Sequence, residues 1–204
     1  MSEQRPASEF DHTVPGFGTV RLRPLDPERD ADTVHSWVAA ERAAFWGMTG
    51  LTRAQVAEIY AHMAGLDTHH AHLAEKDGVP VALLQTYEPA ADRVSECYEV
   101  RPGDIGVHVL LAPAGPEGRR PGWTAALLST FTVYLFRALG RRRVVVDPDV
   151  RNAKAIARFR RQGFELGPVV VLPEIDLPEV YLPAKHAQLA FLTRSAAFPD
   201  PGAG

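Results

Sequence analysis

The segment between residues 104 and 138 limits most strongly what this chain can fold into. Residues 104–112 (DIGVHVLLA) have the apolar, β-branched character of a strand, and a Gly/Pro/Arg-rich loop follows at residues 113–122. Beyond the loop, apolar side chains recur at helical spacing, namely Trp123, Leu127, Phe131, Tyr134, Leu135 and Ala138. We therefore expect a strand, a glycine-containing loop and an amphipathic helix as the central unit.

The residues before this unit predict a strand and two helices. Residues 19–26 (TVRLRPLD) alternate as a strand does, and prolines stop the strand before an acidic helix start at residues 28–32. That helix is expected to end at Gly47, with one face formed by Val34, Trp37, Val38, Glu41 and Phe45. A second helix is expected from an N-cap at Thr52 through Met63.

A β-hairpin is expected next, because Asp77-Gly78 separates two strand-like runs and supplies the positive φ angles of a tight turn. After the central unit, strands are predicted at residues 143–147, 164–172 and 188–193, with a helix at residues 153–162. The element order is β-α-α-β-β-β-α-β-α-β-β. This order predicts a mixed α/β fold.

Length and composition favour one domain that acts on a small molecule. The 204 residues, 46% of them hydrophobic, suffice for one core, expected over residues 19–194 with flexible tails at residues 1–18 and 195–204. A net charge of -3 gives no reason to expect nucleic acid or an anionic membrane as partner. The single cysteine, Cys97, and a start without a signal-peptide pattern favour the reducing cytoplasm. No apolar run is long enough to suggest a membrane span, and the oligomeric state cannot be read from the sequence.

The loop before the central helix is a candidate phosphate site. A helix N-terminus presents unpaired N–H groups and a partial positive charge, and glycine lets the backbone approach phosphate oxygens closely. The candidate residues are Arg119, Arg120, Gly122, Trp123 and Thr124. A solvated Gly/Pro-rich connector explains the same stretch equally well, and Pro121 has no N–H to donate.

His108 is the candidate proton acceptor. It lies in the middle of an apolar strand, where a buried polar group needs a partner, and it points to the face opposite Val107 and Val109. A neutral imidazole there can take the proton of an attacking nucleophile. A hydrogen-bonded histidine without a catalytic role is the alternative.

Asp147 and Asp149 follow the next predicted strand and are the candidate carboxylates. Either one can orient an imidazole ring such as that of His108 or bind an ammonium group. For Asp149, a role as the N-cap of the following helix is the alternative.

A second motif lies in residues 152–164, at the spacing Asn-x-x-Ala-x-x-x-Tyr-x-Lys-x-Gly-Phe. The corresponding residues are Asn152, Ala155, Phe159, Arg161, Gly163 and Phe164. With the loop above, this resembles the GNAT acyltransferases. Four segments resemble the acyltransferases of hydroxamate siderophore biosynthesis, namely those of desferrioxamine pathways and their relatives that act on hydroxylysine. The segments are WVAAERAAFWGM, GDIGVHVLL, VDPDVRNAKAI and LPAKHAQLAFLTR.

The resemblance implies a GNAT fold, in which helices flank a mixed central sheet that is splayed at strands 4 and 5. It implies acetyl-CoA or succinyl-CoA as co-substrate, no tightly bound cofactor, and a small amine or N-hydroxyamine as acceptor. The coenzyme is expected to contact the backbone of Val109 and Leu110, the residue 119–124 loop and Asn152. Trp46 and Met48 are expected to line the acceptor channel. Phe159 occupies the position of the usual Tyr acid.

Two alternatives to this function remain. The chain can be a GNAT enzyme for an ordinary amine, such as an aminoglycoside, a polyamine or a protein N-terminus. It can also be a non-catalytic module that binds acyl-CoA or an acyl-carrier protein. The cluster of His69, His70 and His72 invites a metal site, but alternation leaves two of them on one face with no third ligand, so no metal is expected.

Overall fold

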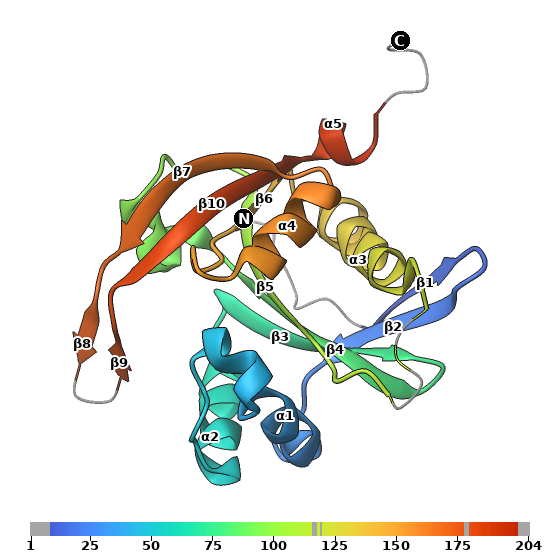
Figure 1. The fold of residues 1–204 in the computed structure, drawn as a ribbon, viewed down its shortest axis with the longest axis horizontal. Helices are drawn as coiled ribbons and strands as arrows, with labels where there is room; N and C mark the ends of the chain where they lie inside the picture. The colour runs from blue at the N-terminus through green and yellow to red at the C-terminus, as the bar shows by residue number, and fades with distance from the viewer. Residues whose placement is uncertain (1–8, 116–117, 119, 178–179, 200–204) are drawn as a thin grey trace. The chain divides into compact units, whose positions relative to one another are not determined.

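The structure is a computed structural model that describes residues 9–115, 118, 120–177 and 180–199. It has the mixed α/β architecture that the sequence predicts (Figure 1). The chain forms two compact units. One unit combines Met1–Thr86 with His108–Tyr134. The other combines Tyr87–Val107 with Leu135–Gly204.

The first unit begins with a strand that the sequence pattern does not predict. β1 (Phe10–Val14) pairs antiparallel with β2 (Gly18–Pro24) over five residue positions. A flexible tail over residues 1–18 is therefore wrong for β1. Alternate residues of β1 are half-buried, so it does have the two-residue period of a strand, but it is short and its turn-rich surroundings obscure that period.

The predicted hairpin is confirmed in the same unit. β2 pairs antiparallel with β3 (His69–Lys76), and the chain then turns into β4 (Val79–Tyr87). Asp77 and Gly78 form the turn with φ angles of 52° and 78°. Both angles lie in the left-handed region that a two-residue hairpin turn needs.

The first predicted helix is two helices. α1 (Ala31–Val38) is followed by a 3₁₀ helix, η1 (Glu41–Trp46), and Ala40 between them is extended, with ψ at 142°. Phe45, expected on the buried face, is 48% exposed. Alanine-rich sequence favours a helix, so nothing local signals this break; only the end at Gly47, which has the left-handed conformation of a helix C-terminus, agrees with the prediction.

α2 (Arg53–Ala64) begins where predicted, because Thr52 and Gln55 form a reciprocal capping box at its N-terminus. The three helical segments and the sheet share one core. Its buried members are Leu25, Val34, Trp37, Val38, Val56, Tyr60, Leu73, Leu83 and Ala112.

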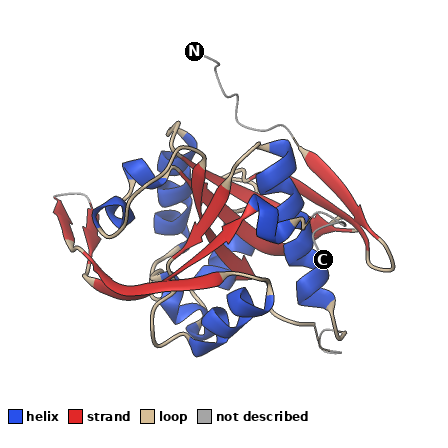
Figure 2. Cartoon of the chain, turned by 90° about the horizontal axis from the view of Figure 1, so that it is seen from above, coloured by secondary structure: helices blue, strands red, loops and turns tan. Residues whose placement is uncertain are grey.

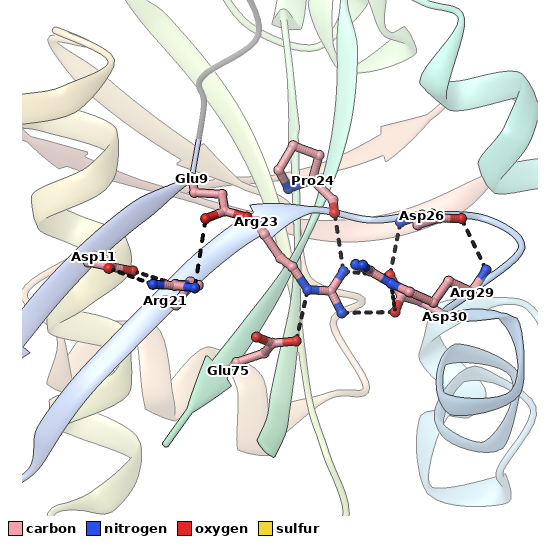
Figure 3. Close-up of polar contacts among 9 residues, drawn as sticks. All are labelled: Glu9, Asp11, Arg21, Arg23, Pro24, Asp26, Arg29, Asp30 and Glu75. Atoms are coloured by element: carbon pink, nitrogen blue, oxygen red, sulfur yellow. Dashed lines mark hydrogen bonds and ion pairs between the residues drawn. The ribbon is translucent and has the colours of Figure 1, made fainter. Parts of the chain in front are cut away.

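Buried charges join β2 to the start of α1 (Figure 3). Arg23 donates to both carboxylate oxygens of Asp30, over 2.6 and 2.8 Å, and to Oε1 of Glu75 over 2.8 Å. Asp30 also accepts the backbone N–H of Asp26. The pair of Arg21 and Asp11, also in Figure 3, is by contrast exposed on the β1–β2 hairpin.

The long helix after the glycine loop is confirmed, with a change of pitch at its end. α3 (Trp123–Val133) continues into a π-helical turn, η4 (Tyr134–Ala138). Tyr134 donates to or accepts from Nε2 of the buried His72 at 3.0 Å. That contact links α3 to β3 within the first unit.

The second unit contains the parallel pair expected for this fold. β5 (Asp104–Leu111) pairs with β6 (Arg143–Val146), and the register runs from Asp104↔Arg143 to Gly106↔Val145. The pairing thus joins three residue positions, although β5 itself continues to Leu111. β10 (Lys185–Thr193) lies between β6 and β7 (Glu165–Leu172) and is antiparallel to both.

α4 (Ala153–Arg161) is confirmed, and three short elements are additions to the prediction. β8 (Ile175–Leu177) and β9 (Val180–Leu182) form a ribbon that prolongs β7 and β10 (Figures 1 and 2). α5 (Arg194–Ala197) lies where a flexible tail is predicted, and Thr193 caps it. The Pro-rich composition of both regions is why neither was expected.

The second unit also has two single 3₁₀ turns between β4 and β5, η2 (Pro89–Ala91) and η3 (Arg93–Glu96). Across the described ranges, no helix is both long enough and apolar enough to cross a bilayer.

Candidate active site

His108 is half-buried in β5, and a polar side chain of β4 contacts its ring. Nδ1 of His108 lies 3.4 Å from Oε1 of Gln85, which is 8% exposed. An amide oxygen only accepts hydrogen bonds, so this contact is a hydrogen bond when Nδ1 of the histidine carries the proton. The polar partner that a mid-strand histidine needs is therefore supplied, at least in part, by Gln85.

Behind Gln85 lies a second buried group that the sequence analysis missed. Nε2 of Gln85 donates to the hydroxyl of Tyr60 over 3.1 Å, and Nε1 of Trp46 donates to the same oxygen over 3.3 Å. Tyr60 is 2% exposed, and this burial raises the pKa of its phenol far above the ordinary value. The result is a continuous polar chain from Trp46 through Tyr60 and Gln85 to His108.

The predicted acceptor residues lie around this chain. The ring of Trp46 meets that of His108 edge to face, with centroids 6.2 Å apart. Met48 and Leu110 are half-buried against the core that contains Tyr60. The structure thus brings Trp46 and His108 together, whereas contact of Val109 and Leu110 with an acyl donor stays a prediction.

Asp147 lies just beyond β6 and is 4% exposed. Its Oδ1 accepts from the hydroxyl of Tyr87 at 3.3 Å, and its Oδ2 accepts from Nζ of Lys185 at 2.9 Å. Burial first, and the charge of Asp147 second, raise the pKa of Tyr87 well above its ordinary value. The carboxylate is thus held by a neutral phenol and an ammonium group, neither of which the sequence analysis identified.

Asp149, which Pro148 separates from Asp147, has different partners. Its carboxylate accepts two hydrogen bonds from the guanidinium of Arg151, at 2.9 and 2.7 Å, and one from the Arg151 backbone N–H. The Arg151 hydrogen bond lowers the pKa of Asp149. Asp149 is not the N-cap of α4; that position belongs to Asn152, whose Oδ1 accepts the N–H of Ala155 at 3.1 Å.

α3 begins after Gly122, and its first turn carries backbone N–H groups without intrahelical partners. Gly122 is the N-cap, with φ at 79°, and a β-carbon there would meet nothing within 4 Å. Trp123 N–H bonds to the carbonyl of Arg120 at 3.1 Å, and Thr124 occupies the second helical position, where an N–H has no intrahelical partner. Arg119 lies outside the described residues.

Phe159 is half-buried on α4 and packs against Phe164, with ring centroids 5.1 Å apart. It is therefore a packing residue in the place where the family motif has a tyrosine. Among the described residues, no three His, Cys, Asp or Glu side chains gather as a metal site would require. His72 instead pairs with Tyr134, and Nδ1 of His69 pairs with the Thr68 hydroxyl.

Each unit therefore contributes one polar assembly. The first unit has His108, whose Nδ1 lies beside the amide oxygen of Gln85, and the N-terminus of α3. The second offers a buried carboxylate held by Tyr87 and Lys185. An imidazole and a helix N-terminus, both in the first unit, are groups that acyl transfer from a phosphorylated donor can use.

The chain is similar to curated proteins at low sequence identity. N(6)-hydroxylysine O-acetyltransferase of Escherichia coli is 25% identical over 185 residues, covering 89% of this chain and 54% of its own length. Lysine N-acyltransferase MbtK of Mycolicibacterium paratuberculosis is 31% identical over 74% of this chain and 66% of its own length. N-hydroxyputrescine acetyltransferase of Acinetobacter baumannii is 27% identical over 47% of this chain and 44% of its own length. The chain spans between about half and two thirds of the length of these relatives.

Solved structures share the fold. An uncharacterised protein of Bacillus halodurans superposes with a TM-score of 0.76 at 21% identity, covering 93% of this chain and 92% of its own. AAC(6')-Ib, solved in complex with paromomycin and acetyl-CoA, superposes with a TM-score of 0.70 at 23% identity, covering 91% of this chain and 99% of its own. Residues 26–172 match the family described as "Acetyltransferase (GNAT) domain". The chain belongs to the GNAT acetyltransferase family.

Proposed function

We propose that this chain is an acyl-CoA-dependent N-acyltransferase that forms hydroxamates. The acceptor is an N-hydroxylated diamine, such as N-hydroxycadaverine, or hydroxylysine, and the donor is acetyl-CoA or succinyl-CoA. The observation that carries the proposal is that His108 lies half-buried in the middle of a strand, with its Nδ1 beside Oε1 of Gln85. This arrangement occurs in a GNAT chain whose curated relatives are named for lysine and for hydroxylated amines.

The donor side rests on the N-terminus of α3. The first-turn N–H groups at Thr124 and its neighbour Ala125 point along the helix axis toward the position that a pyrophosphate would occupy, and Gly122 leaves the approach open. Arg120 adds positive charge beside it. Asn152 caps α4 through Oδ1, and its amide N–H groups are the donors proposed for the pantetheine arm.

Transfer is direct. The amine nitrogen attacks the thioester carbonyl carbon, the new C–N bond forms, and the C–S bond breaks as the tetrahedral intermediate collapses. The nitrogen loses its proton to His108, and the departing thiolate of coenzyme A takes up a proton. Burial raises the pKa of the Cys97 thiol, which donates to the Val171 carbonyl, so no acyl-cysteine intermediate is proposed.

A hydroxylated acceptor suits a site that has His108 as base and no tyrosine acid at position 159. An N-hydroxylamine is much less basic than an alkylamine, so it is already largely neutral near pH 7 and needs less help to become a nucleophile. Phe159 has no proton to donate, so it cannot act as the acid of the family motif. Positioning of the two substrates is then the main contribution to the rate of transfer. The lone, reduced cysteine is consistent with the cytoplasm, which we propose as the compartment.

The identity of the product tests the proposal. The protein is incubated with acetyl-CoA or succinyl-CoA and with N-hydroxycadaverine, hydroxylysine or the plain amines, and released coenzyme A is titrated with a thiol reagent. N-acylation of a hydroxylamine gives a hydroxamate that colours with ferric iron, whereas O-acylation and amide formation do not. Coenzyme A release without ferric colour would overturn hydroxamate formation, and no release with any acceptor would favour a non-catalytic module.

A further inference from the structure

We propose that Gln85 is a positioning residue that holds His108 as its Nδ1–H tautomer, so that Nε2 is the nitrogen that accepts the proton of the attacking amine. The inference rests on the proposed function, since it assigns the geometry of the same histidine. It adds a residue from β4, and behind it Tyr60 and Trp46, to the machinery of the reaction.

The hydrogen-bonded chain begins at Trp46, whose indole N–H can only donate. It donates to the hydroxyl oxygen of Tyr60 at 3.3 Å. Tyr60 is almost fully buried, and burial keeps its phenol protonated at any physiological pH. The Tyr60 oxygen thus accepts from Trp46 and is also the group that Nε2 of Gln85 faces.

The amide of Gln85 lies between Tyr60 and His108 and contacts both. Its NH₂ group faces the hydroxyl of Tyr60 at 3.1 Å, so its carbonyl oxygen faces Nδ1 of His108 at 3.4 Å. An oxygen that only accepts requires a proton on Nδ1. In a neutral imidazole the lone pair then belongs to Nε2.

Gln85 also differs from the carboxylate that orients many catalytic histidines. An amide oxygen fixes the tautomer through a hydrogen bond but carries no charge, so it favours the imidazolium form much less than a carboxylate does. The distance of 3.4 Å is long for a hydrogen bond, as catalytic contacts often are before substrate binds.

The test reads the tautomer directly. Long-range ¹H–¹⁵N correlation spectra of the histidine rings are recorded on the free protein near pH 8, and the signals of His108 are assigned by their loss in His108→Ala. The expected wild-type pattern is a protonated Nδ1 and an unprotonated Nε2. Gln85→Leu, which keeps the side-chain size but removes the acceptor, should shift the ring to a mixture or to Nε2–H.

Kinetics on the same variants separates positioning from folding. Gln85→Leu should lower kcat about tenfold per folded molecule and leave KM for acetyl-CoA within twofold. Gln85→Glu restores an acceptor with a negative charge, so it should recover the Nδ1–H tautomer and move the acidic limb of the kcat/KM profile up by about one pH unit. Tyr60→Phe should partly randomise the tautomer although it leaves Gln85 in place.

Gln188→Leu is the matched control, because the Gln188 amide also donates in a part-buried site, to the carbonyls of Gly167 and Leu189. It should reduce thermal stability without changing the His108 spectrum. A wild-type ring in the Nε2–H form, or a tautomer unchanged by Gln85→Leu, would overturn the assignment. The spectra need no substrate, so this failure is distinguishable from a failure of the proposed reaction, which the ferric assay reports.

Discussion

The ring of Tyr87 lies directly over the α-carbon of Gly106, so that a β-carbon at residue 106 would overlap the ring at Cζ. Gly106 is the last residue of the parallel pairing between β5 and β6. The missing side chain lets the tyrosine cross the strand and donate to Asp147 at 3.3 Å. A glycine is therefore required at residue 106 for the ring of Tyr87 to reach Asp147.

Gly106→Ala should displace Tyr87 and break its hydrogen bond to Asp147. Overpacking of this kind costs about 1–3 kcal/mol, and a stranded buried hydroxyl adds to that loss. Urea unfolding measures the change in stability. Gly115→Ala is the control, because a β-carbon there meets nothing within 4 Å, and equal stability of the two variants would contradict the account.

The charge cluster at Arg23 makes a second stability prediction. Asp30→Ala leaves the Arg23 guanidinium, which is 11% exposed, with Glu75 as its remaining carboxylate, and should cost about 3 kcal/mol. Asp11→Ala removes an ion pair with Arg21 that is about half exposed, and should cost less than about 1 kcal/mol. Both are measured by urea unfolding at pH 7. Similar losses in the two variants would show that burial does not decide the strength of these pairs.

Most of the fold could be predicted because its signals are local. Asp77-Gly78 specifies a hairpin turn by its own φ preference, and Thr52 with Gln55 specifies a helix start by their side chains. The break at Ala40 and the strand β1 lack such signals, because alanine-rich sequence favours a continuous helix and turn-rich surroundings obscure the short β1. No single residue in either stretch predicts the observed structure.

The candidate site was predictable in part for the same reason. His108 and Asp147 are conspicuous as polar residues in or after apolar strands. Gln85 and Tyr60 are not, since a glutamine in a strand and a tyrosine on a helix are ordinary, and only the hydrogen bonds between them give them a role. Lys185 is equally inconspicuous at the start of β10 until its ammonium group reaches Asp147.

Acid stability should depend on His72. Burial first, and the nearby His70 second, lower the pKa of His72 to about 4, from an ordinary value of 6.5. The unfolded chain therefore binds a proton between these values that the native state does not bind. Stability from this group is full above about pH 6.5 and falls by about 3 kcal/mol as the pH drops toward 4.

Urea unfolding at pH 7, 6 and 5 measures that slope. His72→Gln should be less stable at pH 7, because Tyr134 loses its imidazole partner, but its stability should fall less steeply with acid. An unchanged slope in the variant would assign the acid sensitivity to other groups.

Gly122 supports the prediction for coenzyme binding. Its φ of 79° disfavours a β-branched side chain, and a side chain there would fill the approach to the α3 N-terminus. Gly122→Val should weaken coenzyme A binding at least about tenfold in calorimetric titration. Gly140→Val is the matched control, because Gly140 has φ at 65° with equally open surroundings; equal affinity in both variants would remove the loop from the site.

The preference between a hydroxylated and a plain amine tests the central claim most directly. The measurement is kcat/KM for N-hydroxycadaverine and for cadaverine, with acetyl-CoA saturating, in wild type and in His108→Ala. The account predicts that the hydroxylated amine is favoured at least about tenfold, and that His108→Ala costs about 100-fold with it and more with cadaverine. Equal or better kcat/KM for cadaverine would contradict the account while leaving the GNAT fold untouched.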